Sequence, residues 1–210
     1  MNVLVLGASG RTGALIVSEV FRQGHEASAL TRHPKNVRSH AGRVRIFKGD
    51  IFDEGALDLA MARQHAVIYA LGMRKFFGPV KFYSASTRLV LAAMQRHNTK
   101  RLVCITALGV GESRGCGDWL HERLLAPILL RNTLADKTAQ EKLIRDSDRE
   151  WVIVRPARLY DGLPTRAYAV IAIPQPGDRA SRICRADVAE FCVAQLASDE
   201  FLRCTPLLSH

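Results

Sequence analysis

The sequence has little cysteine, and its cysteines are not arranged as a binding site. None of the five forms a C-x-x-C pair, and their number is odd. This pattern argues against a zinc or iron–sulfur site and against a disulfide framework. It is typical of reduced, packed thiols in a cytoplasmic protein, so we expect a cytoplasmic location and no metal site. The cysteines stand at positions 104, 116, 184, 192 and 204.

Long hydrophobic runs are also missing. The first apolar run covers only residues 3–6 and has no basic segment before it, so we do not interpret it as a signal peptide. The longest apolar stretch, 124–130, is interrupted by Pro127 and is far too short to cross a bilayer. The sequence therefore predicts a protein without a membrane segment.

Acidic residues are scarce relative to basic ones. Thirty Lys and Arg residues stand against twenty Asp and Glu residues, which gives a net charge of +10. Such an excess favours an anionic partner, and nucleic acid, an anionic membrane surface and a phosphorylated cofactor are the alternatives. The basic residues are spread over almost every expected helix and loop, so nucleic-acid binding is the weakest of these hypotheses.

What the sequence does have is a regular alternation of apolar runs and amphipathic segments. Its 210 residues are enough for one domain with a real core, and we expect residues 1–210 to form a single domain. Apolar strands that alternate with helices are typical of an α/β fold. We predict a Rossmann-type doubly wound parallel sheet with short substrate-side loops. Strands are expected at 3–6, 25–31, 44–48, 66–71, 101–106, 151–155 and 168–173, and helices up to Gly24 and at 54–64, 84–97, 133–145 and 185–197.

Residues 109–132 are the least regular stretch. The segment opens with GVGESRGCGD, which is flexible by composition, and continues into WLHERLLAPILLR. It predicts either a lid or partner-binding helix, or a surface excursion that packs back on the core. We favour the excursion. The side chains expected to pack are those of Trp119, Leu120, Leu124 and Leu125.

A glycine-rich turn follows the first strand directly. Gly7, Gly10 and Gly13 have the spacing G-x-x-G-x-x-G and open an amphipathic helix. The first glycine permits the tight turn, the second lets a pyrophosphate approach the backbone, and the third lets the helix pack against the strand. A helix N-terminus offers free N–H groups and partial positive charge to phosphates. Strand, turn and helix in this order predict a dinucleotide site.

The expected end of the second strand carries basic residues instead of an acidic one. Chains that use NAD usually place Asp or Glu about 20 residues beyond the glycines, on the ribose 2′-hydroxyl. Here Arg32 and Lys35 bracket that place, and a guanidinium can hold a 2′-phosphate with two hydrogen bonds. The sequence therefore predicts NADP(H) in preference to NAD(H). Asp50 and Gly72 follow two further strands, where ligands bind in open α/β sheets.

Together these motifs resemble a known family. GASGRTG at 7–13, TRHP at 31–34, GDIFD at 49–53 and WVIVRPARL at 151–159 resemble the atypical short-chain dehydrogenase/reductase group. Within that group the likeness is to NmrA-like NAD(P)-binding proteins and to biliverdin-IXβ reductases, also called flavin reductases. It runs from the first residue to the last few and includes SRICRAD at 181–187. The resemblance implies a Rossmann-type fold that binds NAD(P).

The resemblance also assigns residues to parts of the cofactor. It implies that the glycine segment holds the pyrophosphate, through Gly7, Ser9, Gly10, Arg11, Thr12 and Gly13. It implies Arg32 on the 2′-phosphate, Asp50 and Ile51 at the adenine, and Leu71 and Gly72 near the ribose. The residues implied around the nicotinamide are Thr106, Ala107, Pro156, Ala157 and Arg158.

The sequence departs from the group at positions that usually carry chemistry. None of the four tyrosines is followed four positions later by lysine, so the Tyr-x-x-x-Lys pair of ordinary short-chain dehydrogenases is missing. The Ser and His that biliverdin-IXβ reductases place after the fifth and sixth strands correspond to Ala107 and to Ala157 or Arg158. Alcohol dehydrogenation, sugar epimerisation and biliverdin reduction are therefore disfavoured.

Three side chains are candidates for catalysis. Hydride transfer to a conjugated acceptor needs an oriented cofactor and a cation or donor that stabilises the developing anion. Lys137 is placed at the start of the helical segment 137–145 and resembles the lysine of isoflavone-reductase-like members. At the mouth of the site it would be a general acid, and otherwise it is an ordinary helix lysine. Arg158 is the second candidate, as an anion anchor. Tyr160 is the third, as a donor to a carbonyl, although we favour a packing role for its ring.

Two functions fit these observations. The first is an NADPH-dependent oxidoreductase that transfers hydride to a flat conjugated acceptor such as a flavin, a quinone or a related carbonyl compound. The alternative is a non-catalytic NADP(H) sensor of the NmrA type that regulates a partner protein. We expect a small aromatic or conjugated substrate and a monomer or homodimer.

Overall fold

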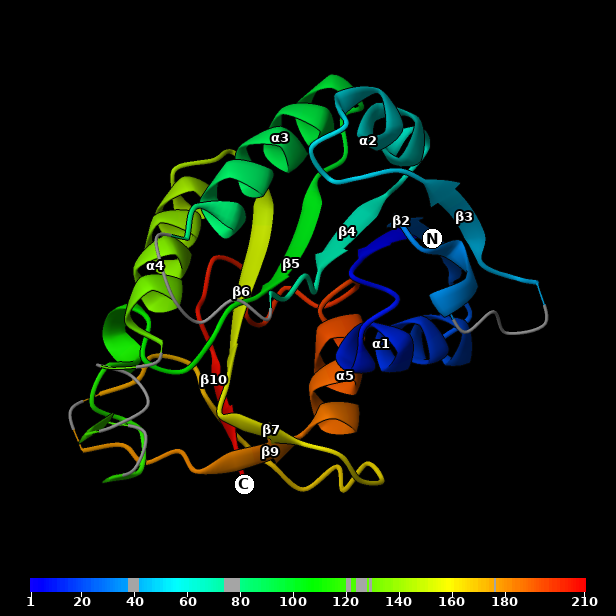
Figure 1. Ribbon diagram of the computed structural model, residues 1–210. Coiled ribbons are helices and arrows are strands. Elements are labelled where there is room, and N and C mark those ends of the chain that lie inside the picture. Colours follow the sequence, from blue (N-terminus) through cyan, green and yellow to red (C-terminus); the bar gives the residue numbers. More distant parts are fainter. Residues whose placement is uncertain (38–41, 74–79, 120–121, 124–127, 129, 176) are drawn as a thin grey trace.

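An eight-stranded sheet forms the centre of the computed structural model (Figure 1), which describes residues 1–37, 42–73, 80–119, 122–123, 128, 130–175 and 177–210. The strand order is β3-β2-β1-β4-β5-β6-β10-β8, and each pairing is parallel except β8 with β10. The strands are β1 (Asn2–Leu6), β2 (Glu26–Thr31), β3 (Arg45–Lys48), β4 (Ala66–Tyr69), β5 (Arg101–Ile105), β6 (Glu150–Pro156), β8 (Ala169–Ile171) and β10 (Leu207–Ser209). The predicted α/β Rossmann-type fold is confirmed.

Helices cover both faces of this sheet (Figure 1). On one side α1 (Arg11–Arg22) packs against α5 (Arg185–Ala194). On the other side α3 (Phe82–Arg96) packs between α2 (Glu54–Met61) and α4 (Arg131–Arg145). We call these the α1/α5 face and the α2–α4 face. The strand order turns back between β1 and β4, and in open sheets of this kind ligands bind at such a point.

The alternating side chains of the central strands build two separate cores. Val3, Ile68 and Val152 belong to the core under the α1/α5 face. Their neighbours Leu4 and Val67 belong to the core under the α2–α4 face. Burial on both sides explains why these strands are apolar throughout, as expected for a parallel sheet covered by helices.

The C-terminal third adds strands that the sequence did not predict. β7 (Arg158–Tyr160) and β9 (Arg182–Cys184) form a small parallel sheet of their own. β10 lies between β6 and β8, where Leu207 and Leu208 are fully buried. Three-residue strands show too little alternation to be recognised, because their position depends on partners far away in the chain.

Two predicted boundaries were wrong. α4 begins at Arg131, so Lys137 lies in the middle of the helix and not at the start of a segment 137–145. The helix expected at 133–145 agrees with α4 to within two residues. The expected strand 168–173 is shorter, Ala169–Ile171, and runs antiparallel to β10.

The excursion predicted at 109–132 begins with a buried turn. Val110 and Ser113 are fully buried, and Gly111–Ser113 is a short 3-10 helix. Trp119 was expected to pack on the core, but 73% of it is exposed. Cys116 is the buried anchor instead, because its carbonyl accepts the N–H of Ala180 at 2.7 Å. Leu120, Leu124 and Leu125 lie outside the described residues.

Two further expectations concern the cysteines, expected as reduced and packed thiols, and the absence of a membrane segment. All five cysteines are free, and four of them are buried. Within the described part of the chain, no helix combines the length and the hydrophobicity that crossing a bilayer requires.

Candidate functional site

A cleft of about 860 Å³ opens at the carboxyl ends of the central strands. This volume lies within the range of small-molecule and cofactor sites. Apart from Arg158, which is also a catalytic candidate and is described below, fifteen residues were predicted to bind the cofactor; all of them contribute to the lining, although they come from six different segments of the chain. They are Gly7, Ser9, Gly10, Arg11, Thr12, Gly13, Arg32, Asp50, Ile51, Leu71, Gly72, Thr106, Ala107, Pro156 and Ala157.

The glycine segment forms a cradle that other residues would fill. The N–H of Gly10 donates to the carbonyl of Gly7 at 2.9 Å, which closes the turn before α1. Gly7 has φ +94°, and a Cβ at Gly13 would lie 2.0 Å from the Gly7 carbonyl oxygen. Among the residues that the structure describes, no side chain caps the start of α1. Its first N–H groups therefore remain for a phosphate, and this segment fits a dinucleotide.

The end of the cleft above β2 and β3 carries the predicted basic residue. Arg32 and Asp50 face each other there, with 3.5 Å between Arg32 Nε and Asp50 Oδ2. Both side chains are substantially exposed and both line the cleft. Lys35 lies in the 3-10 helix Pro34–Asn36 and does not contribute to the lining.

An ionic bridge that the sequence analysis missed joins the glycine segment to the C-terminal third. Asp161 accepts from Arg11 at 2.9 Å and from Arg185 at 2.8 Å. Arg11 is the first residue of α1 and Arg185 is the first residue of α5. Both arginines line the cleft, so two helix N-termini with arginine side chains face the same space. The 150 residues that separate Arg11 from Asp161 left no local pattern to detect.

The other end of the cleft, above β5 and β6, is largely apolar. Leu108 and Leu159, which follow β5 and β6, line it, and Met73, Phe82 and Leu130 add further apolar side chains to the cleft; none of the five was predicted as a site residue. Among the catalytic candidates Arg158 lies here, with an exposed side chain. Asp118, Ser181 and Arg185 add polar groups to the lining of the cleft. An apolar wall with a few polar groups is the usual form of a site for a small aromatic compound.

Lys137 is buried behind this end of the cleft and is not part of the lining. Only 7% of the residue is exposed, and its Nζ lies 4.1 Å from the centre of the Tyr83 ring. Burial lowers the pKa of Lys137 to about 8, against the opposing influence of Cys104 and Glu141. The Tyr83 hydroxyl in turn accepts the N–H of Met73, a lining residue, at 3.0 Å.

Tyr160, the third catalytic candidate, also lies outside the lining. Its ring packs edge-on against His210 at 5.9 Å between centroids. The Arg182 guanidinium lies 5.3 Å from the centre of the same ring. These contacts agree with the packing role that the sequence analysis favoured for the ring.

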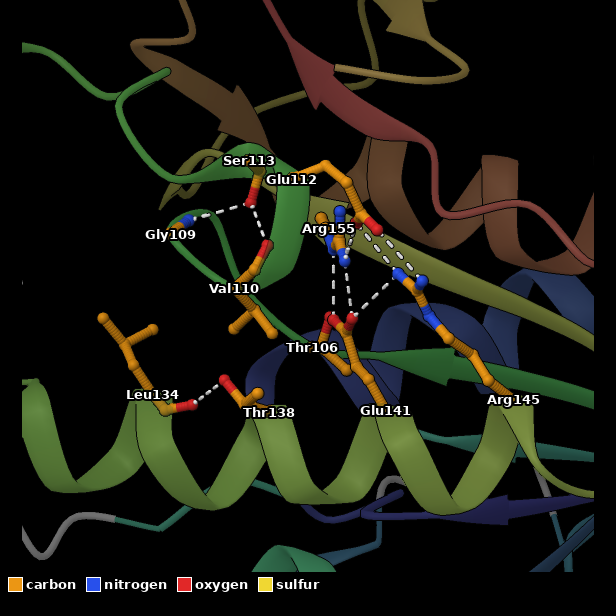
Figure 2. Close-up of polar contacts among 10 residues, drawn as sticks. All are labelled: Thr106, Gly109, Val110, Glu112, Ser113, Leu134, Thr138, Glu141, Arg145 and Arg155. Atoms are coloured by element: carbon orange, nitrogen blue, oxygen red, sulfur yellow. Dashed lines mark hydrogen bonds and ion pairs between the residues drawn. The ribbon is translucent and has the colours of Figure 1, made fainter. Parts of the chain in front are cut away.

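Polar residues of α4 support the cleft from below. Asp136 accepts the N–H groups of Tyr83 at 2.7 Å and Ser84 at 3.2 Å, and so caps the start of α3. One turn further along α4, Glu141 binds Thr106 and Arg155, as Figure 2 shows. Asp136, Glu141 and Arg155 were not predicted as site residues, because nothing local in the sequence distinguishes them from solvated charges.

Comparison with known proteins places this site in a family. A family model described as NAD(P)H-binding matches residues 7–199, which is almost the whole chain. The chain belongs to the NAD(P)H-binding family. The predicted membership is thereby confirmed at the level of NAD(P)H binding.

Relatives of this NAD(P)H-binding protein are known in plants and bacteria. It is 28% identical over 208 residues to an uncharacterized chloroplastic protein of Arabidopsis thaliana, covering 95% of this chain and 73% of that one. It is 24% identical over 169 residues to the uncharacterized protein YwnB of Bacillus subtilis, covering 77% and 74% of the two chains.

Two solved structures share the fold over the full length. ChuY, an anaerobilin reductase from Escherichia coli O157:H7, superposes with a TM-score of 0.83 at 22% identity, covering 100% of this chain and 97% of that chain. A short-chain dehydrogenase/reductase from Veillonella parvula in complex with NADP gives a TM-score of 0.79 at 17% identity, covering 100% and 94%. At these identities the likeness establishes the shared architecture.

Proposed function

We propose that this NAD(P)H-binding protein is an NADPH-dependent reductase that transfers hydride to a flat conjugated acceptor, such as a flavin, a quinone or a related carbonyl compound. The observation that carries the proposal is one continuous cleft with two different halves. A glycine cradle and Arg32 line one half, and an apolar wall with Arg158 lines the other. One half suits a phosphorylated dinucleotide, and the other suits an aromatic molecule that gains negative charge.

The chain's own residues account for binding the cofactor. The N–H groups at the start of α1 and the Arg11 side chain bind the pyrophosphate. Arg32 binds the 2′-phosphate, because its side chain lines the cleft and is 69% exposed, and a guanidinium can hold a phosphate with two hydrogen bonds. We infer a preference for NADPH over NADH from this guanidinium. When bound, the reduced nicotinamide supplies the hydride.

The second half of the cleft accounts for the acceptor. Leu108 and Leu159 bury a flat ring system and exclude water from it. Arg158 stabilises the negative charge that develops on the acceptor as the hydride arrives. Lys137 adds a buried positive charge below this half, with its Nζ 4.1 Å from the centre of the Tyr83 ring. Tyr160 keeps only its packing role in this proposal.

The test is oxidation of NADPH and of NADH with a panel of flavins and quinones. We expect turnover of at least one acceptor, with kcat/KM for NADPH at least tenfold above that for NADH. Arg32→Ala should remove most of this preference, and Arg158→Ala should lower kcat with little change in the Kd of NADPH. Binding of NADPH without turnover of any acceptor would refute the reductase activity.

A second candidate function is an NADP(H) sensor. It is favoured by one observation, which is that Lys137 and Tyr160 both lie outside the cleft lining, away from a bound acceptor. A sensor is expected to bind the oxidised and reduced cofactors with similar Kd and to capture a partner protein in only one of these states. The acceptor panel and these two Kd values together separate the two functions.

A further inference from the structure

Glu141 holds a small polar cluster at the carboxyl ends of β5 and β6 (Figure 2). Its carboxylate accepts the Thr106 hydroxyl at 2.7 Å, and it accepts Arg155 through Nε at 3.1 Å and Nη2 at 2.6 Å. Thr106 is 5% exposed, Glu141 3% and Arg155 0%. The cluster is therefore shielded from solvent, although Thr106 itself lines the cleft.

The protonation of this cluster follows from its burial. A guanidinium stays protonated in proteins, and a fully buried one needs an anionic partner. Glu141 is therefore a carboxylate, and a carboxylate only accepts hydrogen bonds. The Thr106 hydroxyl must then give its single proton to Glu141. What remains on Thr106 Oγ1 is lone-pair density, which accepts hydrogen bonds and cannot donate one.

A second set of contacts prevents the cluster from rearranging. Arg155 Nη2 also donates to Glu112 at 2.8 Å, and Arg145 holds Glu112 from the other side at 2.9 and 3.0 Å. Gly111 leaves no spare room, because a Cβ there would lie 2.4 Å from Arg155 Nη2. Arg155 is thus fixed on Glu141, and Glu141 is fixed on the Thr106 hydroxyl (Figure 2).

We propose that Glu141 is a positioning residue that fixes Thr106 as a hydrogen-bond acceptor in the cleft, and that Thr106 recognises the carboxamide N–H of the nicotinamide and gives no proton to the reaction. The inference rests on the proposed function in one respect, the placement of the nicotinamide above β5 and β6. Dinucleotides lie across the point where the strand order reverses, so a cofactor with its adenine above β2 and β3 has its nicotinamide above β4 to β6.

A cofactor analogue tests this directly. The 3-acetylpyridine analogue of NADP⁺ replaces the carboxamide by an acetyl group, which has a carbonyl oxygen but no N–H donor. We expect calorimetric titration to give a Kd for NADP⁺ about five- to tenfold below that for the analogue, the effect of one hydrogen bond. Thr106→Val, which keeps the shape and removes the acceptor, should bring the ratio of the two Kd values close to one.

Matched variants distinguish a loss of carboxamide recognition from a general loss of cofactor binding. Thr106→Ser keeps the hydroxyl and should keep the ratio, and Thr106→Ala replaces valine if that variant does not fold. Thr31→Val is the control, because Thr31 is a buried threonine that lines the other end of the cleft. It should leave the ratio unchanged even where both Kd values rise.

Three results would overturn the inference: equal Kd values in the unmodified protein, a ratio that persists in Thr106→Val, or no binding of either cofactor. The experiment measures binding and not turnover. A protein that discriminates between the two cofactors but reduces no acceptor would refute the reductase activity while supporting the role of Thr106.

Discussion

The two faces of the central sheet are built on different principles. Under the α1/α5 face the side chains of β5 and β6 stay apolar up to the carboxyl ends of the strands, as Val103, Ile105, Val152 and Val154 illustrate, and the charged pair Arg101–Glu150 lies at the opposite ends. Under the α2–α4 face the same strands begin apolar and end polar, and Arg155 follows Ile153 on that side. Both faces are buried, so exposure to solvent does not explain the difference.

The position of the polar groups explains it. They lie at the carboxyl ends of the strands, below the half of the cleft that we assign to the acceptor. Buried charges are expensive to maintain and stabilise a fold less than apolar side chains of similar size. Apolar packing on the α1/α5 face therefore stabilises the carboxyl ends of β5 and β6, whereas the α2–α4 face places charges and a hydroxyl there and is less stabilising for it.

The largest expected effect is the loss of Arg155. Arg155→Met leaves the Glu141 carboxylate buried without its main partner, and we expect a loss of about 3–5 kcal/mol in the free energy of unfolding. Ile68→Val on the α1/α5 face should cost only about 0.5–1.5 kcal/mol. Urea titration measures both. Equal losses would show that the two faces are not built differently.

The next largest effect is expected at Gly111, in the turn that contacts Arg155, and Gly115 in the same excursion provides the control. Gly111→Ala adds a methyl group 2.4 Å from Arg155 Nη2, which its ion pairs hold in place, at a residue with φ +53°. We expect a loss of about 2–3 kcal/mol. Gly115→Ala is the matched control: Gly115 has φ +83°, but no described atom lies within 4 Å of an added Cβ, and the change should cost about 1 kcal/mol. If chemical denaturation ranks the two variants in the opposite order, the turn is not anchored on Arg155.

Replacement of Lys137 should raise the free energy of unfolding at pH 7, in contrast to the two losses above. Burial lowers its pKa to about 8 from 10.5, so the unfolded chain binds more protons between these values and stability should rise as the pH rises from 8 to 10.5. Lys137→Met should therefore be more stable at pH 7 by about 2 kcal/mol and should lose this rise. Thermal unfolding at pH 7 and pH 10 measures it. The same variant should reduce acceptors at least tenfold more slowly. If Lys137→Met is less stable than the unmodified protein at pH 7, Lys137 is not a destabilising buried charge.

The smallest effect is expected in acid. Hydrogen bonds from Arg145 hold the pKa of Glu112 down at about 2, against an ordinary value of 4.5. The stability that this carboxylate contributes is present above pH 4.5 and is lost as the pH falls towards 2. Because 44% of the side chain is exposed, we expect only about 1 kcal/mol. Glu112→Gln should flatten this part of the pH–stability curve, and an unchanged curve would argue against the ion pair.

The features predicted from the sequence are those with a local cause. The glycine spacing at 7–13 predicts the cradle because turn, cap and helix contact are all set within one short segment. Apolar runs predict the strands because burial on both faces demands them. Arg32 was predicted as a site residue from its distance to the glycines.

The remaining features depend on contacts between distant segments. Arg155 stands at the end of an apolar run and looks like a strand end, and its partners Glu141 and Glu112 lie 14 and 43 residues away. The Arg11–Asp161 bridge spans 150 residues. Single-residue patterns do not specify such pairs, because each member alone resembles a solvated surface charge.

The place of β10 in the sheet has a consequence for biosynthesis. β6 is complete by Pro156, but one of its two neighbours is Leu207–Ser209, which the ribosome adds roughly 50 residues later, or about 3–10 s at ordinary rates of translation. Until then the edge of β6 presents unpaired backbone groups to other nascent chains. Chaperone contact with the half-made protein is therefore expected to concentrate at this edge and to end when the last strand pairs.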